Sequence, residues 1–284
     1  MIYPMSELMI KAKKEGYGIA APCVFSLDTV EACFEVADEM KAPVIVQAAP
    51  SRDLEEVGNM FKFLERRYPN AVVATNLDHG RDFESCVRAI RYGYSSVMID
   101  RSEKPFEENV RETAELVKFA HACGVCVEAE LGHVGQAFQY QETRDSGLTH
   151  KDEAEEFVRR TGVDCLAVAV GTSHGIYKGE PKIDYELLGE LAEMLTIPLV
   201  LHGGSNTGDD LLLRAVKTGI QKINLATDLN LAGAKRMQEY VAANQNPKPG
   251  DKPVDIPGSE KAMKAGYKEM LMHYVKVFGS EGKA

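Results

Sequence analysis

The stretch PLVLHGGSNTGDDLLLRAVKTGIQKINLATDL, residues 198–229, decides the fold because it contains one complete structural repeat. Its apolar run Pro198–His202 predicts a strand, and the amphipathic pattern of Asp209–Lys217 predicts a helix. A second apolar run, Lys222–Leu225, predicts the next strand, and the helical pattern of Asp228–Ala242 follows it. A strand, a helix and a second strand in this order form the unit from which α/β folds are built.

The same alternation occurs eight times along the chain. The other strand-like runs are Gly18–Ala21, Pro43–Ala48, Val72–Leu77, Ser96–Asp100, Cys126–Glu130 and Cys165–Val170. The other helical patterns are Asp28–Met40, Leu54–Arg66, Asp82–Arg91, Glu107–Ala122, Asp152–Arg160 and Asp184–Met194. Eight units in 284 residues predict an α/β fold, a (β/α)8 TIM barrel, as a single domain over residues 1–284 with extra N-terminal and C-terminal helices. A doubly wound sheet is the rival, but it seldom has eight such regular units.

Composition excludes several classes of partner. The formal net charge is −10 and the acidic residues are spread along the chain, which argues against nucleic acid and anionic membranes. Pro4 and Glu7 lie where a signal peptide would be apolar, and no long apolar run follows, so we expect a cytoplasmic protein. The cysteines mostly lie in apolar runs, as reduced core residues do. Cys123 and Cys126 have CxxC spacing, but they follow the end of a helix, which favours packing over redox chemistry.

Polar side chains gather where the predicted strands end. Barrel enzymes carry their catalytic groups at the C-terminal ends of their strands. Six consecutive strands end in or run into polar groups, at Asp78-His79, Asp100, Glu128–Glu130, Gly171–Gly175, His202 and Asn224. A turn or a satisfied buried polar group accounts for any one of these, but six on one rim predict a functional site.

Three histidines on this rim suggest a metal site. His79, His174 and His202 come from the third, sixth and seventh strands, so they can meet only in the folded barrel. Three neutral imidazoles leave one position of a tetrahedral Zn²⁺ open for a substrate oxygen. Their spacing is long and irregular, so this prediction depends on their placement at strand ends. The remaining histidines fall in helical patterns or a loop and are interpreted as structural or solvated: His121, His133, His150 and His273.

Two glycine-rich segments suggest a phosphate site. His174–Gly179 and Gly203–Ser205 offer backbone amides, a hydroxyl and one ammonium. Loops after the seventh and eighth strands of barrels often bind phosphate, although tight turns are an alternative reason for the glycines. We favour phosphate because these segments adjoin two of the predicted metal ligands. A metal with an open position beside a phosphate site predicts a phosphorylated ketone as substrate, and Asp78 is the natural proton donor or acceptor.

Six motifs together resemble the class II, metal-dependent ketose-bisphosphate aldolases. They are LDHG at 77–80, SVMID at 96–100, VEAELG at 127–132, GTSHGIYKGEP at 171–181, PLVLHGGS at 198–205 and KINLATDL at 222–229. The resemblance implies a lyase of carbohydrate metabolism, such as glycolysis. Its reaction would be the reversible aldol cleavage of a ketose (bis)phosphate to dihydroxyacetone phosphate and an aldehyde.

The resemblance also implies roles for the matching residues. His79, His174 and His202 would hold a catalytic zinc, and Asp78 would be the acid/base. Asp100 and Glu130 would lie where the family places a second or alternative metal. A monovalent cation, Na⁺ or K⁺, would lie near the two glycine-rich loops. The dihydroxyacetone phosphate half of the substrate would be bound among Gly175, Lys178, Gly203, Gly204, Ser205, Asn224, Ala226 and Thr227.

The chain departs from the family pattern on the aldehyde side. Pro22–Ser26 replaces an Asn-rich sequence, and Ala49 replaces a Ser or Thr that holds the second phosphate. The loop after the fifth strand lacks the usual glutamate, and Glu142 is the nearest carboxylate. The arginine that usually precedes the last helix is absent from residues 252–264, and Ala226 is typical of tagatose-type members. We therefore expect a tagatose-type or variant specificity, with weak selection for a phosphate on the aldehyde fragment.

Other functions and the assembly stay open. The chain is alternatively a non-catalytic, metal-containing sugar-phosphate binding protein, or a metal-dependent lyase or isomerase that stops at the enediolate. The resemblance implies a homodimer or homotetramer that packs partly through a last helix predicted over residues 259–278. That helix has an apolar face, and covering its own barrel is the alternative use of this face.

Overall fold

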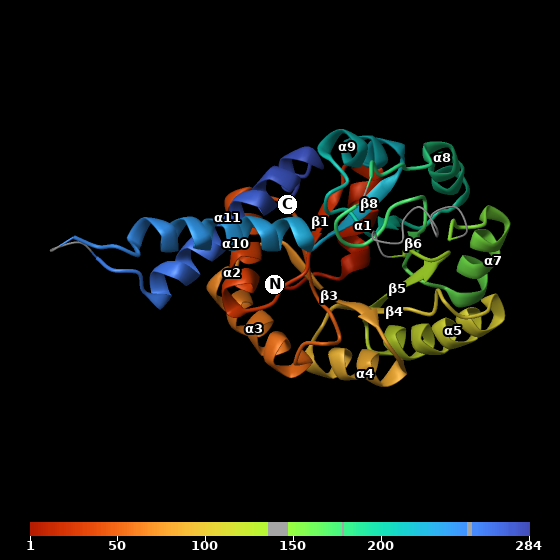
Figure 1. Cartoon of the computed structure of the whole chain (residues 1–284). Helices are drawn as coiled ribbons and strands as arrows, with labels where there is room; N and C mark the ends of the chain where they lie inside the picture. The colour runs from red at the N-terminus through yellow and green to blue at the C-terminus, as the bar shows by residue number, and fades with distance from the viewer. Residues whose placement is uncertain (136–146, 178, 249–251) are drawn as a thin grey trace.

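The computed structural model describes residues 1–135, 147–177, 179–248 and 252–284, and its core is a closed barrel of parallel strands (Figure 1). The strands are β1 (Ile19–Pro22), β2 (Val44–Ala48), β3 (Val73–Gly80), β4 (Ser96–Ile99), β5 (Cys126–Leu131), β6 (Cys165–Val168), β7 (Leu199–Leu201) and β8 (Ile220–Leu225). They pair in chain order, and β8 closes the barrel by pairing with β1. The prediction of a (β/α)8 barrel is confirmed.

Helices alternate with the strands and surround the barrel (Figure 1). They are α1 (Met5–Glu15), α2 (Leu27–Glu39), α3 (Leu54–Arg67), α4 (Phe83–Tyr92), α5 (Phe106–Ala122), α7 (Lys151–Thr161), α8 (Tyr185–Met194), α9 (Asp209–Thr218), α10 (Thr227–Asn244) and α11 (Ile256–Val277). Helix α1 precedes the first strand, and α10 and α11 lie side by side and extend beyond the barrel wall (Figure 1). None of the helices in the described part of the chain combines the length and apolar character that crossing a membrane requires.

Local sequence explains where several helices begin and end. The side chains of Asp53, Asp82 and Asp184 accept hydrogen bonds from backbone amides of the first turns of α3, α4 and α8. These amides have no partner within their own helix, so a side-chain oxygen at this position stabilises the helix start. Gly93 and Gly162 end α4 and α7 in the left-handed conformation that glycine adopts without strain.

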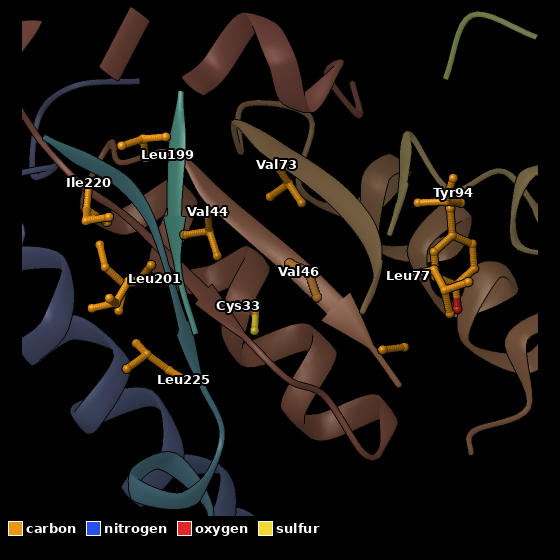
Figure 2. Close-up of a cluster of buried hydrophobic side chains, with 14 of the residues drawn as sticks. Cys33, Val44, Val46, Val73, Leu77, Tyr94, Leu199, Leu201, Ile220 and Leu225 are labelled. Atoms are coloured by element: carbon orange, nitrogen blue, oxygen red, sulfur yellow. The ribbon is translucent and has the colours of Figure 1, made fainter. Parts of the chain in front are cut away.

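Side chains along each strand alternate between two cores. Val44 and Val46 of β2 lie in the layer between the strands and the helices, together with Leu199 and Leu201 of β7 (Figure 2). Ile45, between the two valines, instead belongs to a separate cluster inside the barrel. Because successive side chains of a strand point to opposite faces, one apolar run supplies both cores.

The barrel interior has an apolar half and a polar half. Near the strand starts, interior residues pack with Met5 and Met9 of α1; they include Ile19, Ala21, Ile45, Ala74, Cys126, Cys165, Ala167 and Val200. Near the strand ends, hydrogen bonds and ion pairs join buried or partly buried polar groups: Cys23, Gln47, Asp78, Glu128, Glu130, His202, Lys222 and Asn224. The polar half of the interior therefore carries the candidate site.

The apolar face of α11 packs on its own barrel. Tyr267, Leu271, Tyr274 and Val275 are buried in the core, and the Tyr267 hydroxyl donates to the Cys23 carbonyl at 2.8 Å. Of the two uses predicted for this face, covering the barrel is the one that the structure shows.

The cysteines are all free thiols. In the CxxC pair, Cys123 is exposed and Cys126 is buried, and burial raises the pKa of Cys126. A raised pKa keeps the thiol protonated at neutral pH, as expected of a packing residue rather than a redox centre.

Candidate active site

A distortion at the end of β3 turns His79 toward the barrel opening. Asp78 faces the interior, so regular alternation would point the next side chain outward. His79 instead has a φ of 49°, and the pairing of β3 with β4 shifts between Leu77 and Gly80. Such irregularities re-aim side chains next to active sites. Gly80 completes the turn because a Cβ atom there would lie 2.3 Å from the Met98 carbonyl oxygen.

The three predicted histidines come together in space. The His79 ring centroid lies 4.6 Å from that of His202 and 5.1 Å from that of His174, and the third pair is 5.8 Å apart. One ring nitrogen of each residue belongs to a cluster of possible ligand atoms within 4.8 Å of one another. The predicted convergence of strands three, six and seven on one point is therefore what the fold produces.

Carboxylates orient two of these imidazoles. His79 Nδ1 lies 2.7 Å from Asp100 Oδ2, and Asp100 Oδ1 accepts from the Ser102 amide and hydroxyl. His202 Nε2 lies 3.0 Å from Glu128 Oε1, whose second oxygen accepts from Lys222 Nζ at 2.7 Å. A hydrogen bond at one ring nitrogen fixes the tautomer and leaves the other nitrogen free to bind a metal.

Some buried polar atoms of the site have no hydrogen-bond partner, which points to a metal ion. His174 Nε2, His202 Nδ1 and Glu130 Oε2 are buried and make no hydrogen bond. His202 Nδ1 and Glu130 Oε2 lie 2.9 Å apart, yet they are not directed at each other as donor and acceptor. Buried polar atoms that lack partners are rare, so this donor set fits a divalent metal.

The charge of the surroundings also favours a cation. Burial opposes the charged form of His202, but Glu128 and Glu130 outweigh it and raise the pKa of His202 to about 10. Burial and repulsion from the other two imidazoles lower the pKa of His174 to about 4, which keeps its ring neutral at pH 7. Asp100 and Glu130 form a second possible ligand group with His79, and the position predicted for an alternative metal thus exists geometrically.

Asp78 lies beside the histidines, and each of its two carboxylate oxygens accepts a hydrogen bond. Asn224 Nδ2 donates to Asp78 Oδ1 at 3.0 Å, and Gln47 Nε2 donates to Oδ2 at 3.2 Å. Burial raises the pKa of Asp78, but the combined attraction from Lys222 and the three histidines outweighs burial and holds the pKa below its ordinary value. A fixed, ionised carboxylate beside the metal ligands is suited to take up or return a proton.

The glycine-rich loops border the same cavity. A cavity of about 110 Å³ is lined by Asp78, His79, His174 and most of the predicted substrate-binding residues: Gly175, Gly203, Ser205, Asn224, Ala226 and Thr227. Gly204 does not line it, because its amide donates to the Asn224 carbonyl at 3.2 Å. Lys178 and Glu142 lie outside the described residues.

Steric crowding is a second reason for the glycines. A Cβ atom on Gly203, whose φ is 69°, would lie 2.5 Å from the Ser173 carbonyl oxygen. Gly175 has a φ of 99° and no atom within 4 Å of its Cβ position. The loop after β7 therefore needs glycine for packing, whereas the loop after β6 needs it for backbone conformation.

Sequence reasoning placed Glu128 on the rim without assigning it a role, and it did not single out Lys222 or Gln47 as members of the buried network. Glu128 and Lys222 are fully buried partners, and Gln47 holds Asp78. Two of them occupy inward strand positions two residues from another polar side chain: Glu128 from Glu130, and Lys222 from Asn224. A period of two between polar residues in a buried strand was the available signal.

Comparisons with known proteins show the family of the chain. A family model described as class II fructose-bisphosphate aldolase matches residues 3–283. The fructose-bisphosphate aldolase of Geobacillus stearothermophilus is 39% identical over 288 residues, which cover 99% of this chain and 98% of that protein. The fructose-bisphosphate aldolase of Helicobacter pylori strain J99 is 37% identical over 313 residues, which cover 100% of both. The crystal structure of the YdjI aldolase from Escherichia coli K12 matches with a TM-score of 0.86 and 33% identity over 100% of both chains.

The chain therefore belongs to the class II fructose-bisphosphate aldolase family, whose members are lyases. The family assignment made from the six motifs is confirmed, and so is the assignment as an enzyme. Class II aldolases are generally metal-dependent and act on sugar phosphates, and the donor set described above fits such a metal.

Proposed function

We propose that this protein is a zinc-dependent aldolase that cleaves a ketose phosphate to dihydroxyacetone phosphate and an aldehyde. The observation that carries the proposal is that three imidazoles cluster together and that two of them, His79 and His174, line one small cavity with an ionised Asp78 and the glycine-rich loops. The curated relatives named fructose-bisphosphate aldolase make fructose 1,6-bisphosphate the first substrate to test.

His79, His174 and His202 would hold the zinc, and Asp100 and Glu128 would orient two of these rings. When bound there, zinc supplies a Lewis acid that stabilises negative charge developing on the ketone oxygen. Glu130 would provide an alternative ligand for a second divalent metal position.

Asp78 would move the proton of the reaction. In the cleavage direction its carboxylate removes the hydrogen of the hydroxyl group that becomes the aldehyde oxygen, and in the condensation direction it returns that proton. Gln47 and Asn224 keep the carboxylate aimed at one point, since each donates to a different oxygen. Burial excludes water, because Asp78 is only 5% exposed.

The phosphate of dihydroxyacetone phosphate would lie between the loops after β6, β7 and β8. Gly175, Gly203, Ser205 and Thr227 line the cavity there, and Thr227 begins α10, so unpaired amides of a helix start face this side. The Ser205 oxygen accepts from the amides of Ala226 and Asp228, which leaves its O–H group to donate. We also propose Lys178 and a monovalent cation, Na⁺ or K⁺, as partners of this phosphate.

The substrate would not be restricted to fructose 1,6-bisphosphate. Ala226 lines the cavity where a tagatose-type sequence is expected, and Ala49 offers no hydroxyl to a second phosphate. Cys23, rather than an asparagine, contacts Asp78 at 3.5 Å. These three residues support a tagatose-type or variant specificity.

The assembly would be a homodimer or homotetramer. Exposed apolar residues on the projecting helices, Leu231, Met237 and Val241 of α10 and Ile256 of α11, support this proposal. Light scattering at micromolar concentration should show a mass of at least two chains, and a monomer there would contradict it.

The central experiment measures retro-aldol cleavage by the zinc-loaded protein. The substrates are fructose 1,6-bisphosphate, tagatose 1,6-bisphosphate and fructose 1-phosphate, and release of dihydroxyacetone phosphate is followed by its reduction in a coupled assay. Asp78→Asn should retain zinc and lose about 10²–10⁴-fold in kcat. The matched control is Asp152→Asn, which changes an exposed carboxylate and should leave the rate unaltered.

Proton exchange at dihydroxyacetone phosphate alone separates the alternatives. An aldolase exchanges this proton and also cleaves ketose phosphates, whereas a binding protein does neither. Exchange without any cleavage would identify a lyase or isomerase that stops at the enediolate and would replace the proposed function.

A further inference from the structure

The contacts of the two Asp78 oxygens indicate in which direction the aldehyde half of the bound substrate extends from the cavity. Its Oδ1 atom is held by Asn224 of β8, on the side where the loops after β6, β7 and β8 line the cavity. Its Oδ2 atom contacts Cys23 Sγ, directly after β1, and Gln47 Nε2 of β2. With the phosphate of dihydroxyacetone phosphate on the first side, the other fragment extends toward the ends of β1 and β2.

The loops that follow β1 and β2 bring a cation to this side. Arg52 lies four residues after the end of β2, and its guanidinium carbon lies 4.8 Å from the ring centroid of Phe25 in the loop after β1. Phe25 is two residues beyond Cys23, and two extended residues span at most about 7 Å. Phe25 therefore lies within about 7 Å of Cys23, which contacts Asp78, and it brings the guanidinium of Arg52 to this side of the barrel.

The guanidinium of Arg52 is free to bind an anion. Over the ranges that the structure describes, no carboxylate lies within ion-pair distance of it, and it lies over the Phe25 ring. The adjacent carboxylate of Asp53 is engaged elsewhere, because it accepts from the amides of Glu55 and Glu56 at the start of α3. The aromatic face limits the motion of the guanidinium and leaves its N–H groups available at the edge.

We propose that Arg52 is a specificity-determining residue that binds a phosphate or carboxylate group at the far end of the aldehyde fragment. The proposal depends on the proposed function, since it assigns the second half of that substrate. A guanidinium binds both kinds of anion through two parallel hydrogen bonds. It replaces the expectation of weak selection at this end, which was made because Ala49 lacks the hydroxyl of a Ser or Thr and residues 252–264 lack an arginine.

A second group of cations is a weaker candidate for this role. Arg81, Arg101 and Lys104 line a separate cavity of about 310 Å³ next to His79 and Asp100. Arg101 pairs with Glu112 and donates to the Arg81 carbonyl, and Lys104 Nζ lies 3.5 Å from Glu108. This cavity borders Asp100, whereas Asp78 Oδ2 contacts Cys23 and Gln47 at the ends of β1 and β2, the strands whose following loops carry Phe25 and Arg52. Arg81 therefore serves as the rival in the test.

The test compares kcat/KM for three ketose 1-phosphates that differ only in their far end: a phosphate, a carboxylate and a neutral hydroxymethyl group. Wild-type protein should prefer both anionic substrates. Arg52→Gln should lower kcat/KM for them by roughly tenfold to a hundredfold, mainly through KM. The neutral substrate should change by less than about twofold, because it makes no charge-assisted contact.

Three further variants sharpen the comparison. Arg52→Lys should keep part of the preference for phosphate, since lysine supplies the charge without the two-pronged geometry. Arg66→Gln, at the distant end of α3, makes the same charge change and should alter none of the three rates. Arg81→Gln should leave the preference for an anionic end intact.

Distinct results would overturn the proposal. An equal loss for neutral and anionic substrates in Arg52→Gln would show that Arg52 only supports the loop through Phe25. A wild-type enzyme indifferent to the far-end anion, or a preference removed by Arg81→Gln instead, would also reject it. A wild-type protein that neither cleaves any substrate nor exchanges the proton of dihydroxyacetone phosphate would reject the proposed function itself.

Discussion

The two sides of the barrel opening are built in different ways. On the side of β5, β7 and β8 the functional groups sit on strand ends, and buried partners such as Glu128 and Lys222 fix them. On the side of β1 and β2 the exposed groups, Phe25 and Arg52, sit on loops and contact each other through an aromatic face. The difference teaches that, under the proposed function, the reactive centre would depend on rigid strands, whereas substrate selection would depend on loops, where sequence can change without disturbing the barrel.

Removing a metal ligand should produce the largest effect on the strand-end side. We expect His79→Ala, His174→Ala and His202→Ala each to abolish turnover and to lower zinc content, because a tetrahedral site tolerates the loss of one of three protein ligands poorly. Zinc is measured by elemental analysis after gel filtration. His273→Ala, which removes an exposed histidine of α11, is the control. Full zinc occupancy with normal turnover in any ligand variant would contradict the assignment.

Changing Glu128 tests whether the buried partners matter as much as the ligands. Glu128→Gln weakens the acceptor of His202 Nε2 and removes the charge facing Lys222, so we expect zinc affinity to fall about 10–100-fold. Titration with a competing chelator measures this affinity. Pairing the change with Lys222→Met removes both buried charges, and the free energy of unfolding should then recover part of its loss. Unchanged zinc affinity in Glu128→Gln would restrict Glu128 to a packing role.

A pair of glycine variants separates packing from conformation in the two loops on the phosphate side. Gly203→Ala places a methyl group against the Ser173 backbone at a φ of 69°, and we expect a loss of about 3 kcal/mol in the free energy of unfolding. Gly175→Ala meets no atom and should lose only about 1–2 kcal/mol from its positive φ. Urea denaturation measures both values. Equal losses would mean that the crowding at Gly203 relaxes without cost.

The smallest effect is expected on the β1 side, where ion pairs hold α11 to α2. A carboxylate oxygen of Glu35 lies 2.7 Å from Lys264 Nζ, and another lies 3.0 Å from Lys268 Nζ. Burial raises the pKa of Glu35, but the two lysines outweigh burial and hold this pKa below its ordinary value. Glu35→Gln should therefore cost about 1 kcal/mol at pH 7. A lowered pKa in the folded state gives stability above pH 4–5 that is lost as the pH falls through the folded pKa.

The two proteins should consequently converge in stability as the solution is acidified. Thermal unfolding of wild type and Glu35→Gln between pH 7 and pH 3 measures this convergence. A difference that stayed constant over that range would show that the stabilisation does not come from the ionised form of Glu35.

Sequence reasoning was most successful where local pattern and fold rule act together. Strand runs such as Pro43–Ala48 were found within a residue or two of the observed β2, since apolar runs and amphipathic helices are local properties. The rule that barrel enzymes react at strand ends then selected Asp78 and the three histidines, which the structure brings together. This rule did not identify the buried partners, because it says nothing about which side chains meet inside the barrel.

The remaining features depend on contacts between distant residues. Lys222 and Glu128 are 94 positions apart and become partners only through the closure of the barrel. The turn at His79 requires the shifted register between β3 and β4, and a histidine in the sequence gives no sign of a positive φ. The apolar face of α11 suited either a partner or the barrel, and only packing decided for the barrel.

The sequence by itself determined the eightfold repeat, the rim of polar strand ends and the family, because strand periodicity and motif order are written along the chain. The tertiary structure decided which ring nitrogens of His79 and His202 face carboxylates, and that the Arg52 guanidinium lies over the Phe25 ring. These are relations between side chains from different strands and loops. They arise from the way the barrel closes, and the spacing of residues along the chain does not tell which side chains come close together in space.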